Sequence, residues 1–467
     1  MTELLAERIA RHAAEYAESS AVVSAREHVD YREFWSRVTR TAAGLDGMNR
    51  VAVLPTSDVE SLVVVAAAMH AGVSVVLLHR HLLPNQLSRV LELAKPGAVV
   101  AAPPHHRRVR KLGFDGDIRT VAGLASAGES GTARPETELL VGVTSGTTGE
   151  PKLFVRNQQS WSTTLDRSDA TFDIGGGDRV SVPGVLDHTH FLYGALHALT
   201  RGATVDLRSA VEALNDGATH LYSVPTVAWD VVRSGTGPFE RVREVLSSAA
   251  RWPRTGRQAL QEVLPNAALV HFYGASELSF VSFDRGLGAE DEKSAGKLFD
   301  GVEVDIRDGL VFVRSDMLFD GYLTERGVVD GPADGWMSVG DRGAVAGDQL
   351  RLFGRDSEML IRAGLNVEPA AIEAALTALP GIAEAACIGI PDARMGEAPA
   401  AAIVVDANAP DLDAIWRHLR ATLPTPSIPV QLLTMDSLPR TPRGKLDRQA
   451  LAVVFGGHRG AAAGPNS

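Results

Sequence analysis

Short apolar segments alternate with helical segments through the first two-thirds of this 467-residue chain. Residues 57–70 have the apolar face of a helix, and the β-branched run 73–78 follows them directly. The same patterns return later in the chain, at 84–93, 98–102, 203–207, 211–216, 220–224 and 269–273. Short apolar strands separated by helices are typical of parallel sheets with both faces covered. The sequence therefore predicts an α/β fold whose sheets are largely parallel.

From about residue 302 the pattern changes to short strands joined by Gly and Asp turns. These strands are 302–306, 310–313 and 349–353. They predict a small β subdomain over about 302–355 within an N-terminal domain of residues 1–355. The next unit, 356–456, mixes strands with helices and is long enough for a core of its own. We expect it to be a small α+β C-terminal domain, followed by a disordered Gly- and Ala-rich tail, 457–467.

Charge and cysteine content narrow the functional classes. The formal net charge of -11 argues against general binding of nucleic acid. Cys387 is the single cysteine, so it cannot form an internal disulfide, and its apolar neighbours predict a small buried residue. The N-terminus lacks the apolar stretch of a signal peptide, and the apolar segment 62–78 is interrupted by His70 and Gly72. We expect a cytoplasmic protein that binds neither nucleic acid nor a membrane.

A loop rich in glycine and hydroxyl groups follows the apolar run 139–143. Its candidate ligand-binding residues are Thr144, Ser145, Gly146, Thr147, Thr148, Gly149 and Lys152. Glycines let backbone N–H groups approach an anion, hydroxyls add donors and lysine adds positive charge, which together suit a polyphosphate. The spacing is neither that of a Walker loop nor that of a nucleophile elbow. A flexible surface turn is the alternative interpretation.

Further motifs stand beside this loop in a fixed order, at 272–277, 338–342, 353–369 and 439–448. Together with the loop, they resemble the signatures of the adenylate-forming superfamily, which includes acyl-CoA synthetases, luciferases and peptide-synthetase adenylation domains. The resemblance spans roughly residues 20–455, and the segment 273–280 is most similar to the acyl-CoA synthetase branch. It implies ATP-dependent activation of a carboxylic acid. It also implies a large N-terminal domain followed by a small mobile one.

The resemblance implies a nucleotide site. Glu277 would hold Mg²⁺ on the phosphates of ATP, since a hard cation prefers oxygen ligands. Tyr273 would present its ring to adenine, with Gly274 and Ser276 beside it. Asp341 and Arg355 would bind the ribose hydroxyls, as an acceptor and a donor for a diol. Alternatives are a solvated loop glutamate, a core tyrosine and an interdomain salt bridge.

Three further residues carry the implied chemistry and motion. Lys445 corresponds to the family lysine that contacts the carboxylate and the α-phosphate during adenylation; a solvated basic tail is the alternative. Thr144 joins Lys445 and Glu277 in the predicted catalytic set. Ser357 stands at the hinge position, where family members commonly carry Asp or Lys, and a hinge must absorb a large backbone rotation.

The acyl pocket is implied to border the segment 187–190. His190 is the candidate gate, and the other candidate pocket residues are Tyr193, Val224, Ser248, Ala249 and Gly274. Asp187, His188 and His190 also have the residue types of a zinc site, and a zinc hydrolase built on these histidines is one alternative function. The sequence does not identify the acid.

The acceptor is implied to reach the site by a tunnel past Ala363 and Gly364, where many CoA ligases carry Gly-Gly. The combined prediction is an ATP- and Mg²⁺-dependent ligase that forms an acyl-adenylate and passes the acyl group to a thiol, with CoA as co-substrate. One alternative acceptor is a carrier-protein thiol in trans, and an amine or another small nucleophile is a second. A nucleotide-binding protein without catalysis is an alternative from another class.

Overall fold

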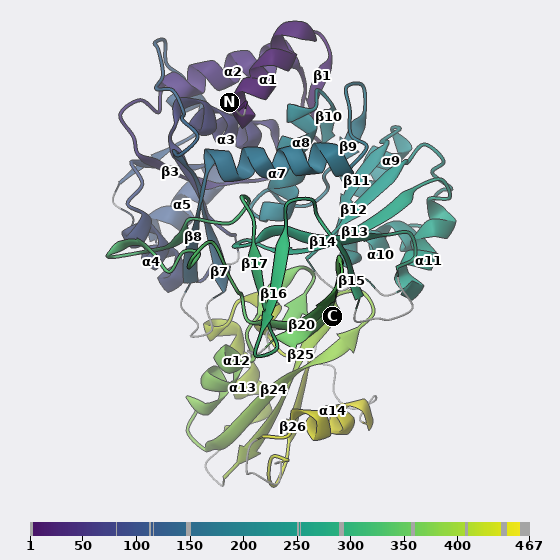
Figure 1. The fold of residues 1–467 in the computed structure, drawn as a ribbon. Coiled ribbons are helices and arrows are strands. Elements are labelled where there is room, and N and C mark those ends of the chain that lie inside the picture. Colours follow the sequence, from purple (N-terminus) through teal and green to yellow (C-terminus); the bar gives the residue numbers. More distant parts are fainter. Residues whose placement is uncertain are drawn as a thin grey trace.

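The computed structural model describes residues 3–80, 82–111, 114, 116–145, 151–249, 252, 254–288, 294–355, 360–406, 410–439 and 446–457. Residues up to 355 form a large body, and the residues from 360 form a smaller one beneath it in the view of Figure 1. No helix within these ranges is long and apolar enough to cross a lipid bilayer.

The larger sheet has thirteen strands within the described ranges. In spatial order these are β16 (Glu303–Arg307), β17 (Leu310–Arg314), β20 (Asp341–Ala346), β21 (Gln349–Arg355), β15 (Ser294–Leu298), β14 (Ser279–Arg285), β13 (Ala268–Ala275), β12 (Glu244–Ser247), β11 (His220–Ser223), β9 (Arg179–Ser181), β10 (Thr204–Asp206), β1 (Ser20–Val23) and β2 (His28–Asp30). The run from β13 to β1 is parallel, as the apolar β-branched strands predicted.

The second sheet has eight strands within the described ranges. In order they are β19 (Gly327–Val329), β18 (Gly321–Thr324), β8 (Pro151–Asn157), β7 (Glu138–Ser145), β4 (Ser74–Leu77), β3 (Arg50–Leu54), β5 (Ala98–Ala101) and β6 (Asp117–Arg119). Its parallel core, β7-β4-β3-β5-β6, ends on an antiparallel hairpin of β7 with β8. The carboxyl end of β7 therefore leads directly into the glycine loop.

Helices cover and join the two sheets (Figure 1). They are α1 (Leu5–Glu15), α2 (Tyr31–Ala43), α3 (Val59–Ala71), α4 (Pro84–Ala94), α5 (Pro103–Lys111), α6 (Val121–Leu124), α7 (Gln158–Thr171), α8 (Thr189–Thr200), α9 (Ala210–Asn215), α10 (Pro225–Arg233) and α11 (Arg254–Val263). One apolar cluster contains residues of α3, α7, α8 and both sheets. Helix α3 is buried on nearly all sides, as its apolar sequence predicts, and it begins at Asp58, which caps the Ser61 N–H, and ends at Gly72 with φ +72°.

The predicted β subdomain is an antiparallel extension of both sheets. Strands β16, β17, β20 and β21 continue the larger sheet through β15, whereas β18 and β19 join the second sheet beside β8. This arrangement brings β18 and the start of β20 next to the ends of β8 and β13.

The C-terminal residues form a sheet of β23 (Leu365–Val367), β22 (Leu360–Arg362), β25 (Gly396–Val405), β24 (Ile382–Asp392) and β26 (Gln431–Thr434). The accompanying helices are α12 (Pro369–Thr377), α13 (Leu412–Thr422), the 3₁₀ turn η1 (Thr425–Ser427) and α14 (Arg448–Gly457). Two apolar clusters lie entirely within this unit, and Cys387 is buried in one of them, as predicted. The α/β architecture with a small C-terminal α+β unit agrees with the predicted fold class.

Candidate active site

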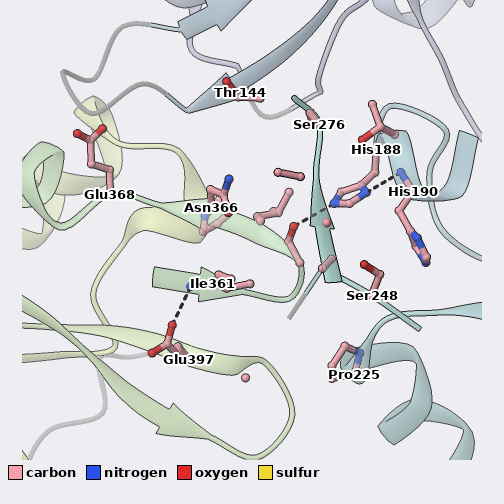
Figure 2. Close-up of a pocket in the computed structure, with 18 of the residues that line it drawn as sticks. Thr144, His188, His190, Pro225, Ser248, Ser276, Ile361, Asn366, Glu368 and Glu397 are labelled. Carbon is pink, nitrogen blue, oxygen red and sulfur yellow. Dashed lines mark hydrogen bonds between the residues drawn. The ribbon is translucent and has the colours of Figure 1, made fainter. Parts of the chain in front are cut away.

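The carboxyl ends of parallel strands from both sheets meet at one cavity of about 1860 Å³. Thr144 at the end of β7, Pro225 after β11, Ser248 after β12 and Tyr273 near the end of β13 all line it. Residues of the C-terminal unit close the opposite side, among them Asn366 and Glu368 in Figure 2. Ligands of open α/β sheets bind at this edge, because the loops that follow parallel strands converge there.

The glycine-loop residues that the structure describes lie at the end of β7 and the start of β8, which pair with each other. Its last described pair is Ser145 opposite Pro151, and Thr144 is the register partner of Lys152. Thr144 and Lys152 both line the cavity, and the Lys152 ammonium lies 5.2 Å from the ring centre of Tyr322. The predicted residues Gly146, Thr147, Thr148 and Gly149 lie outside the described residues, as does the side chain of Ser145.

The end of β13 supplies the second wall of this site. Tyr273, Gly274, Ser276 and Glu277 all line the cavity, as the resemblance implied. A Cβ atom on Gly274 would lie 2.0 Å from the Ser279 carbonyl oxygen, so only glycine allows strands β13 and β14 to approach this closely. The strand pairing is irregular at this position, which turns the following residues toward the cavity.

Glu277 is a buried carboxylate beside the cavity, 8% exposed. Its Oε1 accepts a hydrogen bond of 2.9 Å from the Tyr322 hydroxyl. Burial and the Glu277 charge raise the pKa of Tyr322, so this hydroxyl stays a donor at neutral pH. The second oxygen of Glu277 has no hydrogen-bond partner among the described residues. A buried carboxylate with one such oxygen suits a hard cation, and Glu277 would therefore hold Mg²⁺.

The two residues predicted to bind ribose lie next to each other. Asp341 begins β20 and is the register partner of Arg355 at the end of β21. The Asp341 carboxylate is 5% exposed and accepts a hydrogen bond from the Tyr273 hydroxyl. The side chain of Arg355 lies outside the described residues, but the strand register places its backbone beside Asp341.

The predicted acyl pocket is an aromatic part of the same cavity. His190, Tyr193, Ser248 and Ala249 line it, whereas Val224 is buried behind the wall and Pro225 takes its place. The His190 ring lies 5.2–5.6 Å from the rings of Phe191, Tyr222 and Phe272, centre to centre.

His190 donates Nε2–H to the Ser223 carbonyl at 2.8 Å. Burial and the neighbouring His188 lower the pKa of His190 to about 3, so the ring is neutral at pH 7. The neutral imidazole uses its one N–H on the Ser223 carbonyl, so it can shape the pocket but brings no charge to the site.

The turn between β22 and β23 contacts the acyl pocket. Ala363 has φ +50° and Gly364 has φ +78°, which is the two-residue hairpin turn with both central residues left-handed. The His188 Nε2–H donates to the Gly364 carbonyl at 3.0 Å (Figure 2). Gly364 lines the cavity, and a Cβ added to it would lie 3.0 Å from Cβ of Ala249. Ala363 is not among the described residues that line the cavity.

Two further contacts hold the C-terminal unit against the larger body. Arg394 donates to both Asp230 oxygens at 3.0–3.2 Å, and the Thr226 hydroxyl donates to the Arg394 carbonyl at 3.2 Å. Both partners in the larger body lie on α10, the helix that begins at the cavity with Pro225.

The geometry gives no support to the zinc alternative. Asp187 accepts a hydrogen bond of 3.0 Å from the Arg80 backbone N–H, and His188 and His190 donate to carbonyls. Among the described residues there is no group of three His, Cys, Asp or Glu side chains that could hold a metal ion.

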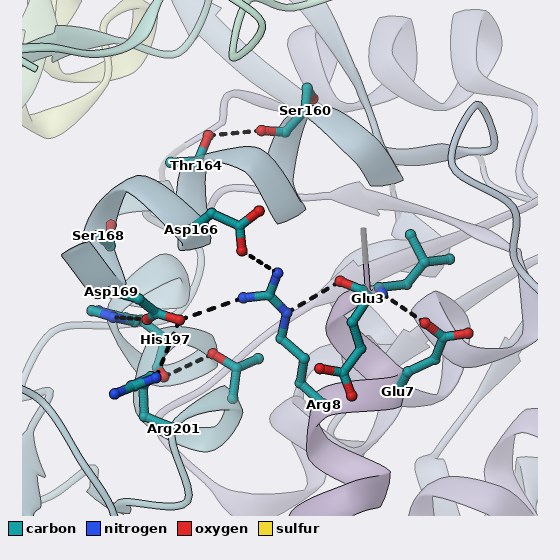
Figure 3. A network of polar contacts seen from close by, with 12 residues as sticks. Glu3, Glu7, Arg8, Ser160, Thr164, Asp166, Ser168, Asp169, His197 and Arg201 are labelled. Carbon is teal, nitrogen blue, oxygen red and sulfur yellow. Dashed lines mark hydrogen bonds and ion pairs between the residues drawn. The ribbon is translucent and has the colours of Figure 1, made fainter. Parts of the chain in front are cut away.

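A buried polar network supports the wall behind the acyl pocket (Figure 3). Arg8 of α1 pairs with Asp166 at 2.5 Å and with Asp169 at 3.5 Å, both on α7. His197 of α8 contacts Asp169 at 3.1 Å and the Tyr222 hydroxyl at 2.8 Å. The network joins α1, α7 and α8 to the strand that carries Tyr222, whose ring contacts His190.

Several lining residues were not predicted from the sequence. Arg156, Trp161, Thr164 and Ser279 line the cavity, as does Asn366 of the C-terminal hairpin. The sequence does contain a signal for Arg156. It lies four residues after Lys152 on the same strand, so both side chains belong to the same face of the sheet. Of the remaining predicted residues, Lys445 and Ser357 lie outside the described residues.

Comparison with known proteins places the chain in the class of AMP-forming acid–thiol ligases. The chain belongs to the AMP-binding enzyme family. The family model for AMP-binding enzymes matches residues 9–323, and the model for the AMP-binding enzyme C-terminal domain matches residues 371–445. The chain is thus a member of the adenylate-forming superfamily, on its acyl-CoA synthetase branch.

Individual relatives agree with this assignment. An uncharacterized acyl–CoA ligase of Bacillus subtilis (strain 168), YhfT, is 33% identical over 460 residues, or 92% of this chain and 93% of the relative. The amide bond synthetase McbA from Marinactinospora thermotolerans has a similar structure, with a TM-score of 0.84, 25% identity and coverage of 97% and 99%. A malonyl-CoA ligase with methylmalonyl-CoA and AMP bound has a TM-score of 0.78, 28% identity and coverage of 91% and 97%.

Proposed function

We propose that this enzyme joins a small carboxylic acid to the thiol of CoA in two half-reactions. In the first, a carboxylate oxygen of the acid bonds to the α-phosphorus of ATP, and the bond to the β-phosphate oxygen breaks, releasing pyrophosphate. In the second, the thiol sulfur bonds to the acyl carbon, AMP leaves with the electrons of the C–O bond, and the thiol proton passes to solvent. Attack on a polyphosphate requires screened charge and fixed geometry, not a side-chain nucleophile.

One observation supports a thiol as the acceptor. The turn between β22 and β23 docks on the predicted acyl pocket. The His188–Gly364 hydrogen bond holds a domain-borne hairpin at the place where an acyl-adenylate would lie. The cavity continues between the two units, past Ile361 and Asn366, which leaves a path for a long slender arm such as that of CoA. We assign this arrangement to the transfer half-reaction.

The first half-reaction would need a different arrangement. Lys445 would then contact the acid and the α-phosphate, and the small domain would rotate about Ser357 to bring it there. At the nucleotide site Thr144 and Lys152 would contact the phosphates, Tyr273 the adenine, and Asp341 with Arg355 the ribose. Mg²⁺ at Glu277 would neutralise phosphate charge.

The proposal is tested by measuring pyrophosphate release over a panel of carboxylic acids, with and without CoA, and by identifying products by mass spectrometry. We expect acyl-CoA and AMP in equal amounts. Lys445→Ala should abolish ATP–pyrophosphate exchange while leaving the melting temperature unchanged, and Lys297→Ala, on the exposed surface, is the matched control. Normal exchange by Lys445→Ala would refute the assigned chemistry.

An amine acceptor is the second candidate, because the amide bond synthetase superimposes over 97% of this chain. Its test is the same reaction with an amine in place of CoA. An amide as the main product, with no thioester when CoA is present, would favour it over the thiol.

A further inference from the structure

Arg156 is a buried cation on β8 whose hydrogen bonds all go to neutral groups. The residue is 4% exposed. Its Nε donates to the Ser160 hydroxyl at 3.0 Å, one terminal nitrogen donates to the Ser276 carbonyl at 3.4 Å, and the other donates to the Thr164 hydroxyl at 3.4 Å. A guanidinium has five N–H groups. One N–H on each terminal nitrogen therefore has no partner among the described residues.

No carboxylate among the described residues forms an ion pair with this guanidinium. Asp320 and Glu277 act on it only through space, and each is engaged elsewhere, with Asn157 at 2.5 Å and with Tyr322 at 2.9 Å. Burial lowers the pKa of Arg156 to about 10, so the side chain is still a cation at pH 7. Burying an unpaired charge is costly, and such a group is normally found where a ligand supplies the opposite charge.

Arg156 lines the part of the cavity that we interpret as the acyl pocket, whose walls include aromatic side chains. The neighbouring lining residues are Trp161, Thr164, Tyr193, Ser279 and Phe280. The Thr164 and Ser279 hydroxyls lie 2.9 Å apart, and Ser279 has φ +60°, a left-handed conformation that is unfavourable for serine. Because the Thr164 hydroxyl donates to the Ser160 carbonyl at 2.8 Å and accepts from Ser279, the open donors of this wall belong to the guanidinium.

A hydrocarbon acid would leave the two open N–H groups of Arg156 without partners. An acid with a second carboxylate would match them, because the two open N–H groups of a guanidinium fit the two oxygens of one carboxylate. The aromatic rings of Trp161, Tyr193 and Phe280 are each at least nine-tenths buried, and they close the pocket around this point.

We propose that Arg156 binds the distal carboxylate of a dicarboxylic acid, so that the enzyme activates one carboxylate while it holds the other. This inference rests on the proposed function and specifies its substrate class. The competing interpretation is that Arg156 only positions the Ser276 carbonyl and thereby the Glu277 loop. That interpretation accounts for one contact of 3.4 Å and leaves the open N–H groups of Arg156 unexplained.

The test compares acids of equal chain length with and without the second carboxylate: malonate with propionate, succinate with butyrate, and glutarate with valerate. We expect kcat/KM for pyrophosphate release to be at least 100-fold higher for the best dicarboxylate than for its partner. Arg156→Met should lower that ratio at least 100-fold, chiefly by loss of activity on the dicarboxylate. Arg156→Lys, which keeps the charge but not the paired donors, should retain an intermediate ratio.

Arg50→Met is the matched control, because Arg50 is a half-buried arginine of the same sheet that pairs with Glu138 away from the cavity. It should leave the ratio unchanged. Melting temperatures of all variants identify any that fail to fold. Calorimetric titration of the folded proteins with the best dicarboxylate, without ATP, measures the subsite independently of catalysis.

An equal loss on both members of each acid pair in Arg156→Met would show a positioning function and overturn the proposal. A wild-type preference for the monocarboxylates would overturn it as well. If no acid releases pyrophosphate but dicarboxylate binding depends on Arg156, then the proposed function fails while the subsite stands. If pyrophosphate release is normal and binding is independent of Arg156, the subsite fails alone.

Discussion

Gly364→Ala should slow transfer to the thiol about tenfold and leave adenylation within twofold of wild type. The added Cβ would lie 3.0 Å from Cβ of Ala249, 3.5 Å from Cγ1 of Val224 and 3.6 Å from Nε2 of His188. Overpacking at such a contact costs about 1–3 kcal/mol, and about 1.4 kcal/mol corresponds to a factor of ten. This cost applies only while the hairpin is docked, so it falls on the half-reaction that uses the docked arrangement.

Gly364→Ala also strains the backbone, and this effect can be measured separately from the effect on docking. Gly364 has φ +78°, and alanine in that conformation costs about 1–2 kcal/mol whether or not the hairpin is docked. This strain should lower the free energy of unfolding of the C-terminal unit without changing the equilibrium between the docked and undocked positions of the hairpin. Gly347→Ala is the matched control, because Gly347 has φ +61° and a Cβ there would meet no atom within 4 Å.

The assay measures the half-reactions one at a time. A single-turnover mixture of enzyme, MgATP and acid gives the rate of pyrophosphate formation, and a CoA chase of the preformed adenylate gives the rate of transfer. Equal slowing of both steps in Gly364→Ala, or no slowing of either, would refute the assignment of the docked hairpin to transfer.

Three further changes follow from the site and its support. Glu277→Gln should raise the Mg²⁺ concentration required for half-maximal adenylation by about 10- to 100-fold, and an unchanged magnesium titration would contradict the metal assignment. His220 is fully buried with its pKa lowered to about 4, so the unfolded state binds the extra proton below about pH 6.5 and stability falls as the pH is lowered. Urea unfolding at pH 7 and pH 5.5 measures how much the free energy of unfolding falls with pH. The fall should be about 1 kcal/mol larger in wild type than in His220→Leu, and equal falls in the two proteins would refute this. Arg8→Met removes a buried guanidinium from the carboxylates Asp166 and Asp169, which are 48% and 21% exposed, and should lower the free energy of unfolding by about 1 kcal/mol with little effect on KM for ATP; a wild-type melting temperature would show these contacts to be dispensable.

The sequence predicted those parts of the site that follow strand ends. The family resemblance implied that Thr144, Tyr273 and Glu277 share one site. In the structure Thr144 and Tyr273 lie near the ends of β7 and β13 and Glu277 follows β13, which explains physically why they line one cavity. Asp341 and Arg355 were predicted as a pair, and the antiparallel register of β20 with β21 is what brings them together.

Other parts depend on features that the sequence does not encode locally. Val224 and Pro225 are adjacent at the end of β11, and only the direction of successive side chains decides which of them lines the cavity. The contacts of Arg156 with Ser276, and of His188 with Gly364, join residues 120 and 176 positions apart. Such contacts arise from the packing of α7 and from the orientation of the small domain, which no periodicity in the chain reveals.

The charge near the glycine loop bears on the proposed rotation of the small domain. The described charged side chains at the predicted phosphate and ribose positions are Lys152, Glu277 and Asp341, and the neutral His190 adds no charge. These side chains therefore carry a net negative charge before ATP and a carboxylate add their own. In the proposed adenylation step, Mg²⁺ at Glu277, Arg355 and Lys445 would supply the positive charge that these side chains lack. Under that proposal the small domain would deliver Lys445, so the hairpin of β22 and β23 would have to leave its docked position before the first half-reaction.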